Sequence, residues 1–208
     1  MDARELEAEL RRMVRGEVRF DTETRARYST DASNYRQVPI GLVLPKDAED
    51  VERTLAACRK FDVPVLSRSG GTSLAGETCN VAVVMDVSKY MNRIVGIDCE
   101  GKTARAEPGR VNDDLRTKVE ENNPTFGLDP ATHNHNTFGG MIGNNSCGIH
   151  AQMAGKCARL RLLGSALLTS FYRHHCQRIH AVAAGHGEWA YVPPLVLYRR
   201  LQESQSCR

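Results

Sequence analysis

The sequence lacks long hydrophobic runs and closely spaced cysteine pairs, and each absence excludes a class of protein. No stretch approaches the roughly 20 apolar residues that a membrane-spanning helix needs. The N-terminal residues, Met1 to Glu5, are too charged for a secretory signal. The seven cysteines contain no C-x-x-C spacing, so neither a disulfide framework nor a zinc or iron–sulfur site is supported. We therefore expect a cytoplasmic protein with no membrane span, no metal site and mostly reduced thiols.

Acidic residues and lysine are scarce in the last quarter of the chain. Residues 157–208 contain seven Arg and two Glu but no Lys and no Asp, and they hold four of the seven histidines. By subtraction from 28 basic and 25 acidic side chains, residues 1–156 hold 21 and 23. The composition therefore changes abruptly near residue 156. The total net charge of +3 is too small to indicate a nucleic-acid partner.

The pattern of apolar residues predicts a small parallel α/β unit followed by an antiparallel subdomain. Strands are expected where short apolar runs occur, and helices where apolar residues recur on one face. The first part comprises a helix over 3–15, an extended loop over 17–38, a strand over 40–44, a helix from 47 to about 62, and extended segments over 64–66 and 81–86. The second part comprises a hairpin of 93–98 with 102–107, and a helix over 111–122.

A glycine-rich turn, residues 66–76, is the most distinctive local motif. Gly70 and Gly71 lack a Cβ atom, so the backbone can adopt a positive φ there and approach a ligand closely. Successive backbone N–H groups in such a turn favour an anion. A positive charge and hydroxyl donors are supplied by Arg68, Ser69, Thr72 and Ser73. The turn therefore predicts a phosphate or pyrophosphate site, although it matches neither the Walker loop nor G-x-G-x-x-G. The alternative is an ordinary turn between two strands.

A second glycine-rich stretch, residues 126–148, combines an Asn- and Thr-rich loop with the start of a helix. Gly139, Gly140 and Gly143 have the spacing to share one helical face, which predicts that something flat approaches it. The start of a helix also presents free N–H groups to a phosphate. Two such segments together predict a dinucleotide bound between the subdomains. The His133, His135, His150 and Cys147 set could instead suggest a metal, but the expected ligand spacings are missing.

The motifs Gly70-Gly-Thr-Ser-Leu-Ala-Gly76, Asp129-Pro-Ala-Thr132 and Gly139-Gly-Met-Ile-Gly-Asn-Asn-Ser-Cys-Gly148 occur in this order. Together they resemble the FAD-binding domain of FAD-linked oxidases, of the vanillyl-alcohol oxidase and p-cresol methylhydroxylase type, in the glycolate oxidase or D-lactate dehydrogenase branch. The resemblance covers residues 28–156. It implies an α+β, two-subdomain FAD-binding PCMH-type fold: a small parallel α/β unit plus a mixed or antiparallel sheet with helices.

The resemblance also implies the residues that hold FAD. The pyrophosphate would be wrapped mainly by the backbone of Ser67, Arg68, Ser69, Gly70, Gly71, Thr72 and Ser73. The pyrophosphate, ribityl and isoalloxazine side would be lined by Pro130, Ala131, Thr132, Thr137, Gly140, Asn144 and Gly148. Family members that tether flavin covalently use a histidine in the first loop. Thr72 and Ser73 stand there, so we expect non-covalent FAD.

We divide the chain into an N-terminal helix with an extended lead-in (1–27), an FAD-binding domain incomplete at its C-terminal end (28–156) and an unrecognised basic tail (157–208). The tail is interpreted as out-of-frame translation after a frameshift or truncation; the alternative is a genuine divergent tail. If no other reading frame downstream encodes family-like sequence, the frameshift interpretation is wrong.

The expected function is an FAD-binding oxidoreductase fragment that resembles dehydrogenases acting on D-lactate, glycolate or 2-hydroxyglutarate. The resemblance implies a small-molecule substrate and an unidentified electron acceptor. It also implies that the catalytic side chains lie beyond this sequence, so no catalytic residue is assigned. The alternative is a non-catalytic flavin-binding remnant without a substrate domain.

Overall fold

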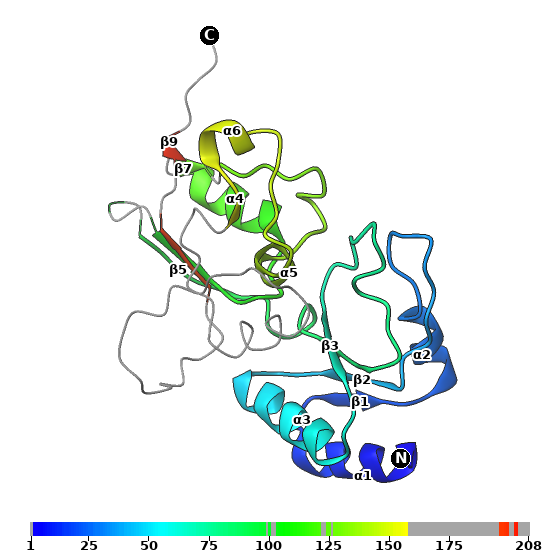
Figure 1. Cartoon of the computed structure of the whole chain (residues 1–208). Coiled ribbons are helices and arrows are strands. Elements are labelled where there is room, and N and C mark those ends of the chain that lie inside the picture. Colours follow the sequence, from blue (N-terminus) through cyan, green and yellow to red (C-terminus); the bar gives the residue numbers. More distant parts are fainter. Residues whose placement is uncertain are drawn as a thin grey trace, which may run out of the picture. The chain divides into compact units, whose positions relative to one another are not determined.

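The computed structural model describes residues 2–98, 100, 103–121, 124–125, 127–157, 196–199 and 202–203. The chain forms two compact units, Met1–Asn92 and Arg93–Arg208 (Figure 1). The boundary falls where the sequence changes from the predicted parallel unit to the predicted hairpin. The two-part organisation expected for the fold is therefore present.

Unit 1 contains a four-stranded sheet in which the strand order differs from the chain order. Its elements are α1 (Ala3–Met13), β1 (Glu17–Arg19), α2 (Thr22–Arg27), β2 (Gly41–Leu44), α3 (Ala48–Lys60), β3 (Val65–Arg68) and β4 (Val83–Asp86). The order is β1-β2-β4-β3, with β4 parallel to both β2 and β3 and β1 antiparallel to β2. The predicted parallel pairing is confirmed.

The core of unit 1 lies between the sheet and the helices α1 and α3, which lie on the same side of it in Figure 1. Leu6 and Leu10 from α1 are fully buried and pack with Val43 and Val83 from the sheet. Burying one such side chain stabilises the fold by about 1.5–3 kcal/mol. The first helix is therefore part of the unit's core.

The expectation of an extended loop over residues 17–38 is wrong for its first half. Glu17–Arg19 forms β1, and Thr22–Arg27 forms α2, which buries no residue. The helix begins because the Asp21 carboxylate accepts a hydrogen bond from the Thr24 N–H at 2.8 Å. A helix with no buried stripe has no apolar periodicity, so periodicity could not reveal it.

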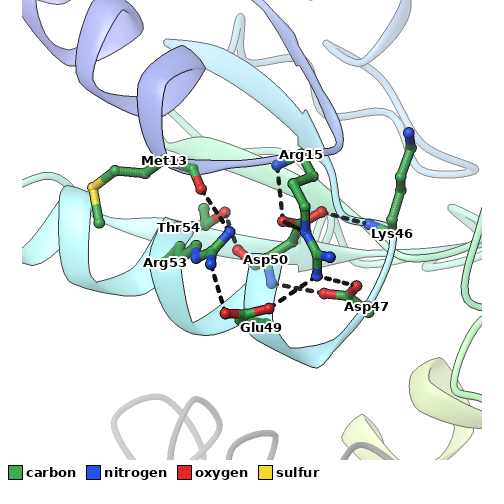
Figure 2. A network of polar contacts seen from close by, with 8 residues as sticks. All are labelled: Met13, Arg15, Lys46, Asp47, Glu49, Asp50, Arg53 and Thr54. Atoms are coloured by element: carbon green, nitrogen blue, oxygen red, sulfur yellow. Dashed lines mark hydrogen bonds and ion pairs between the residues drawn. The ribbon is translucent and has the colours of Figure 1, made fainter.

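The carboxylate of Asp50 connects the turn after α1 to the start of α3 (Figure 2). Its side chain is completely buried and accepts hydrogen bonds from the Arg15 N–H at 2.9 Å and the Lys46 N–H at 3.0 Å. The Arg15 guanidinium lies 3.8 Å from the same carboxylate and also contacts Asp47 and Glu49. Two backbone segments therefore depend on one buried acceptor.

Unit 2 is built on an antiparallel sheet with helices. Its elements are β5 (Ile94–Asp98), β6 (Thr103–Ala106), α4 (Asn112–Glu120), β7 (Pro124–Thr125), α5 (Phe138–Gly143), α6 (Ala151–Ala154), β8 (Val196–Arg199) and β9 (Gln202–Glu203). The β5–β6 hairpin is as predicted, and β8 pairs antiparallel with β6. β8, which lies in the tail, covers the edge of β6 that does not pair with β5.

The core of unit 2 joins the sheet to α4 and α5. It consists of Ala104, Ala106, Leu115, Val119, Leu128, Phe138, Met141 and Cys157. Leu115 and Val119 lie on the buried face of α4. Phe138 and Met141 anchor α5 in the same core, which fixes the helix that follows the predicted flavin loop.

Thiol reactivity should separate the four cysteines that the structure describes. Cys147 is exposed, whereas Cys58, Cys79 and Cys157 are buried, and burial raises the pKa of all three buried thiols, to about 12 for Cys58 and Cys157. Since only the thiolate reacts, we expect a thiol-alkylating reagent at pH 8 to label Cys147 first. Peptide mass mapping measures the order, and a Cys147→Ser variant is the control. Rapid labelling of Cys58 in the folded protein would contradict this packing.

The Cys58 and Cys157 thiols predict a loss of folding stability at alkaline pH. Their folded-state pKa values of about 12 lie above the value of 9.0 of an unperturbed thiol. As the pH rises, the two thiols therefore lose their protons in the unfolded state before they do so in the folded state. Their contribution to the free energy of unfolding declines from about pH 9 to about pH 12.

Candidate functional site

The glycine-rich turn follows β3 directly and contains a left-handed residue. Gly71 has φ +62°, and its carbonyl accepts a hydrogen bond from the Ala32 N–H at 3.0 Å. Gly76 also has a positive φ, +74°, and packs against the Tyr35 ring. The need for glycine is therefore confirmed at Gly71 and extends to Gly76, whereas Gly70 is not among the residues with positive φ.

The backbone of the turn presents a row of hydrogen-bond donors. The N–H groups of residues 70–74 have no hydrogen-bond acceptor within the described part of the chain. Gly71, Thr72 and Ser73 are half-buried, and Gly70 and Leu74 are exposed. Consecutive unpaired N–H groups around a left-handed residue attract an anion. This is the arrangement that the sequence predicted for a pyrophosphate.

The side chains of Arg68 and Ser73, which the sequence analysis gives as donors to an anion, form hydrogen bonds within the protein. The Arg68 Nη1 atom donates to the carbonyl oxygens of Tyr28 at 3.2 Å and Thr78 at 3.3 Å. The Ser73 hydroxyl accepts hydrogen bonds from the backbone N–H groups of Ala75 and Glu77, both at 3.2 Å. These side chains hold the turn in shape, while its N–H groups are left for a ligand.

The predicted site residues of unit 2 divide between the surface and the interior. Exposed residues are Ala131, Thr132, Gly140 and Asn144; Gly148 is half-buried; Pro130 and Thr137 are buried. Gly140 and Asn144 lie four residues apart at α5 and therefore share its outer side. The Thr137 hydroxyl caps the helix by accepting from the Gly140 N–H at 3.4 Å.

The expectation that three glycines form one open face of α5 is wrong. Gly139 and Gly143 are buried, whereas Gly140 is exposed. A Cβ atom on Gly139 would lie 3.0 Å from the Pro108 side chain, so this glycine allows close packing inside unit 2. Spacing alone could not show which side of a short helix faces the core.

The first N–H groups of α5 are also not available for a phosphate. The Phe138 N–H donates to the Arg110 carbonyl at 3.1 Å, and the Gly139 N–H donates to the Pro108 carbonyl at 2.7 Å. The helix has only six residues, and the segment before α4 supplies its acceptors. The expected anion site at this helix start is therefore wrong, and the turn of unit 1 remains the anion-binding candidate.

Buried amides beneath the 130–137 loop were not foreseen. Asn112 is fully buried, and neither of its side-chain polar atoms has a hydrogen-bond partner among the described residues; the same holds for the buried Asn136 Oδ1 atom. The backbone joins the two residues, because the Asn112 N–H donates to the Asn136 carbonyl at 3.0 Å. Unmatched buried polar atoms are costly, so they fit a region that holds a polar ligand or water. The apolar periodicity of α4 gave no signal for them.

The histidine and acidic side chains of this region contact charged neighbours, and Asp129 is shared between Arg116 and His150. The His133 Nδ1 atom lies 2.7 Å from Asp113 Oδ2, and Arg116 binds Asp129 at 2.7 Å. The Asp113 carboxylate of α4 therefore has a partner at the surface of unit 2. Within the described residues, no cluster of three potential metal ligands occurs.

Residues 39–166 match the family model described as FAD binding domain. D-2-hydroxyglutarate dehydrogenase of Pseudomonas putida is 32% identical over 174 residues, covering 82% of this chain and 16% of that protein. Glycolate oxidase subunit GlcD of Bacillus subtilis is 34% identical over 140 residues, covering 65% of this chain and 30% of that protein. The chain therefore spans less than a third of the length of these two relatives.

Solved structures support the same fold. Alkyldihydroxyacetonephosphate synthase aligns with a TM-score of 0.75 and 18% identity, covering 96% of this chain and 40% of that one. p-Cresol methylhydroxylase aligns with a TM-score of 0.69 and 16% identity, covering 98% and 44%. The predicted PCMH-type fold is thus confirmed. Since the family model matches well over half of the 208 residues, the chain belongs to the FAD binding domain family.

Proposed function

We propose that the chain forms the FAD-binding part of an oxidoreductase that oxidises a 2-hydroxy acid of the D-2-hydroxyglutarate, glycolate or D-lactate type. The N–H groups of residues 70–74, which have no acceptor among the described residues, carry this proposal, because such a row suits the pyrophosphate of a dinucleotide. The likeness to two 2-hydroxy acid oxidoreductases supports the substrate class. FAD, when bound, would accept the hydride from the α-carbon of the acid.

The residues of this chain would bind and orient the cofactor. In unit 1, the N–H groups of residues 70–74 would hold the pyrophosphate. In unit 2, the exposed residues Ala131, Thr132, Gly140 and Asn144 would supply the surface for the ribityl chain and ring. The base that takes the hydroxyl proton would come from the part of the relatives that this chain does not span.

Non-covalent binding is part of the proposal. The turn from Ser69 to Thr78 contains no histidine, cysteine or tyrosine that could bond to the flavin ring. Denaturing the loaded protein should therefore release all flavin into the filtrate.

Among the described residues, every helix is too short or too polar to cross a lipid bilayer.

Substituting Gly71 by alanine should weaken FAD binding about tenfold or more, because a side chain at a positive φ costs roughly 1–2 kcal/mol. The new Cβ atom would also lie 2.8 Å from Arg68 Nη2. Titration of the purified chain with FAD, followed by flavin fluorescence, measures the dissociation constant.

Gly96→Ala is the matched control, because a Cβ atom there meets no heavy atom within 4 Å. It should leave the dissociation constant unchanged. Equal FAD binding by wild type and Gly71→Ala would contradict a role for the turn. Flavin retained without turnover of any of the three acids, with an artificial electron acceptor, would identify a flavin-binding module without catalysis.

A further inference from the structure

The Arg68 guanidinium lies at the point where the two ends of the glycine turn meet. Arg68 is the last residue of β3, and its Nη1 atom donates to the Thr78 carbonyl at 3.3 Å on the far side of the turn. The same atom donates to the Tyr28 carbonyl at 3.2 Å. The guanidinium also lies over the Tyr28 ring, 5.1 Å from its centre. One side chain therefore connects three segments of backbone.

Tyr28 is itself fixed by the sheet. Its hydroxyl donates to Asp86 Oδ2 at 2.7 Å, and Asp86 is buried at the end of β4. Arg68 and Asp86 are direct neighbours in the parallel pairing of β3 and β4. Burial and the Asp86 carboxylate raise the pKa of Tyr28, so the hydroxyl remains a donor at physiological pH. Tyr28, Arg68 and Asp86, which we call the clamp, are thus held by hydrogen bonds and strand pairing.

The clamp touches the part of the turn that determines its shape. A Cβ atom at Gly71 would lie 2.8 Å from Arg68 Nη2, so the guanidinium packs directly against the left-handed residue. Thr78 also forms a second hydrogen bond, in which its hydroxyl donates to Asp31 at 2.9 Å. The five free N–H groups lie between these two fixed points.

We propose that Arg68 is a positioning residue: through Tyr28 and Asp86 it holds the N–H groups of residues 70–74 in their anion-binding arrangement, and it does not act as a charge contacting the phosphate. This inference rests on the proposed FAD-binding function. It predicts that Tyr28 and Asp86 contribute to the affinity for FAD, although neither residue flanks a glycine motif.

Arg68→Lys and Arg68→Met separate geometry from charge. Lysine keeps the positive charge but lacks the planar fork that bonds carbonyls and stacks on a ring. If Arg68 positions the turn, both variants should raise the dissociation constant for FAD about tenfold, since hydrogen bonds from a charged group are lost in both. Tyr28→Phe should weaken binding in the same direction, although it removes no charge.

The salt dependence of FAD affinity adds a readout that a change in folding stability alone would not move. A positioning role predicts that Arg68→Met leaves the slope of log Kd against log salt concentration unchanged. If Arg68→Lys binds like the wild type while Arg68→Met loses both affinity and slope, Arg68 contacts phosphate as a charge and the inference is overturned.

Amide hydrogen exchange on the ligand-free chain tests the clamp without flavin. The N–H groups of Ala32 and Thr78 are protected only while the turn is in place, because they bond the Gly71 carbonyl and the Asp31 carboxylate. Both should exchange about tenfold faster in Arg68→Lys and Tyr28→Phe, given the hydrogen bonds lost. Arg27→Lys, at an exposed arginine paired with Glu23, is the control and should change neither.

The FAD titration and the hydrogen-exchange measurement test the proposed function and the clamp separately. Accelerated exchange together with no FAD binding by the wild type would overturn the proposed function and leave the clamp established as the element that shapes the turn. Unchanged exchange in Arg68→Lys would overturn the clamp, even if the wild type binds FAD tightly.

Discussion

Substituting Gly148 by alanine should destabilise unit 2 by about 3 kcal/mol. A Cβ atom at this position would lie 2.0 Å from the Leu128 carbonyl oxygen and 2.1 Å from the Asp129 carbonyl oxygen. Backbone atoms cannot move aside as the end of a flexible side chain can, so the loop over 128–130 must shift. Leu128 is fully buried in the core of unit 2, and moving it would open that core.

Differential scanning calorimetry measures this effect as a fall of roughly 10 °C in the melting temperature. Gly96→Ala should lie within about 0.5 kcal/mol of the wild type, because its Cβ atom enters open space. Unchanged melting of Gly148→Ala, combined with weaker FAD binding, would show that this glycine makes room for the cofactor and not for the backbone.

Replacing Asp50 by alanine should lower the free energy of unfolding by about 3 kcal/mol. The buried carboxylate accepts from the Arg15 and Lys46 N–H groups, and both donors would lose their acceptor at once. Asp50→Asn should cost less, because one amide oxygen can still accept. Both variants should lower the urea midpoint with the m-value unchanged, since neither alters the surface exposed on unfolding.

Glu49→Ala is the control for Asp50, one residue earlier on the same helix. Glu49 contacts Arg15 and Arg53, but its side chain is 54% exposed, so its ion pairs contribute at most about 1 kcal/mol. Equal destabilisation by the two alanine variants would show that the whole charged network matters, and not the buried acceptor.

Much of the fold could be predicted from the sequence because its main elements have apolar patterns. Leu6 and Leu10 recur at helical spacing and are buried in α1, and the apolar runs at β2 and β4 indicated strands. The prediction failed in detail where polar chemistry decides the outcome. In α3, Thr54 is buried whereas Leu55 is only partly buried, and the Thr54 hydroxyl is satisfied inside the core by donating to the Asp50 carbonyl at 2.7 Å.

The candidate site was predicted in part for a related reason. A glycine at a left-handed position leaves a trace in the sequence, and Gly71 was found in this way. The contact between Arg68 and Tyr28 leaves no such trace in the sequence. Tyr28 is 40 residues away from Arg68 and meets it only once the sheet has formed. Likewise, the glycines of α5 could not be assigned to packing or to ligand before Pro108 was placed beside Gly139.

The strand order of unit 1 has a consequence for the chain as it leaves the ribosome. β4 is the last of the four strands to be synthesised, yet it lies between β2 and β3. Until residue 86 has emerged, the two earlier strands have no parallel neighbour, and their unpaired backbone edges are exposed to other chains. Asp86, the last residue of β4, also completes the contacts around Tyr28. The nascent chain therefore carries its glycine turn for some time before that turn can take its final shape.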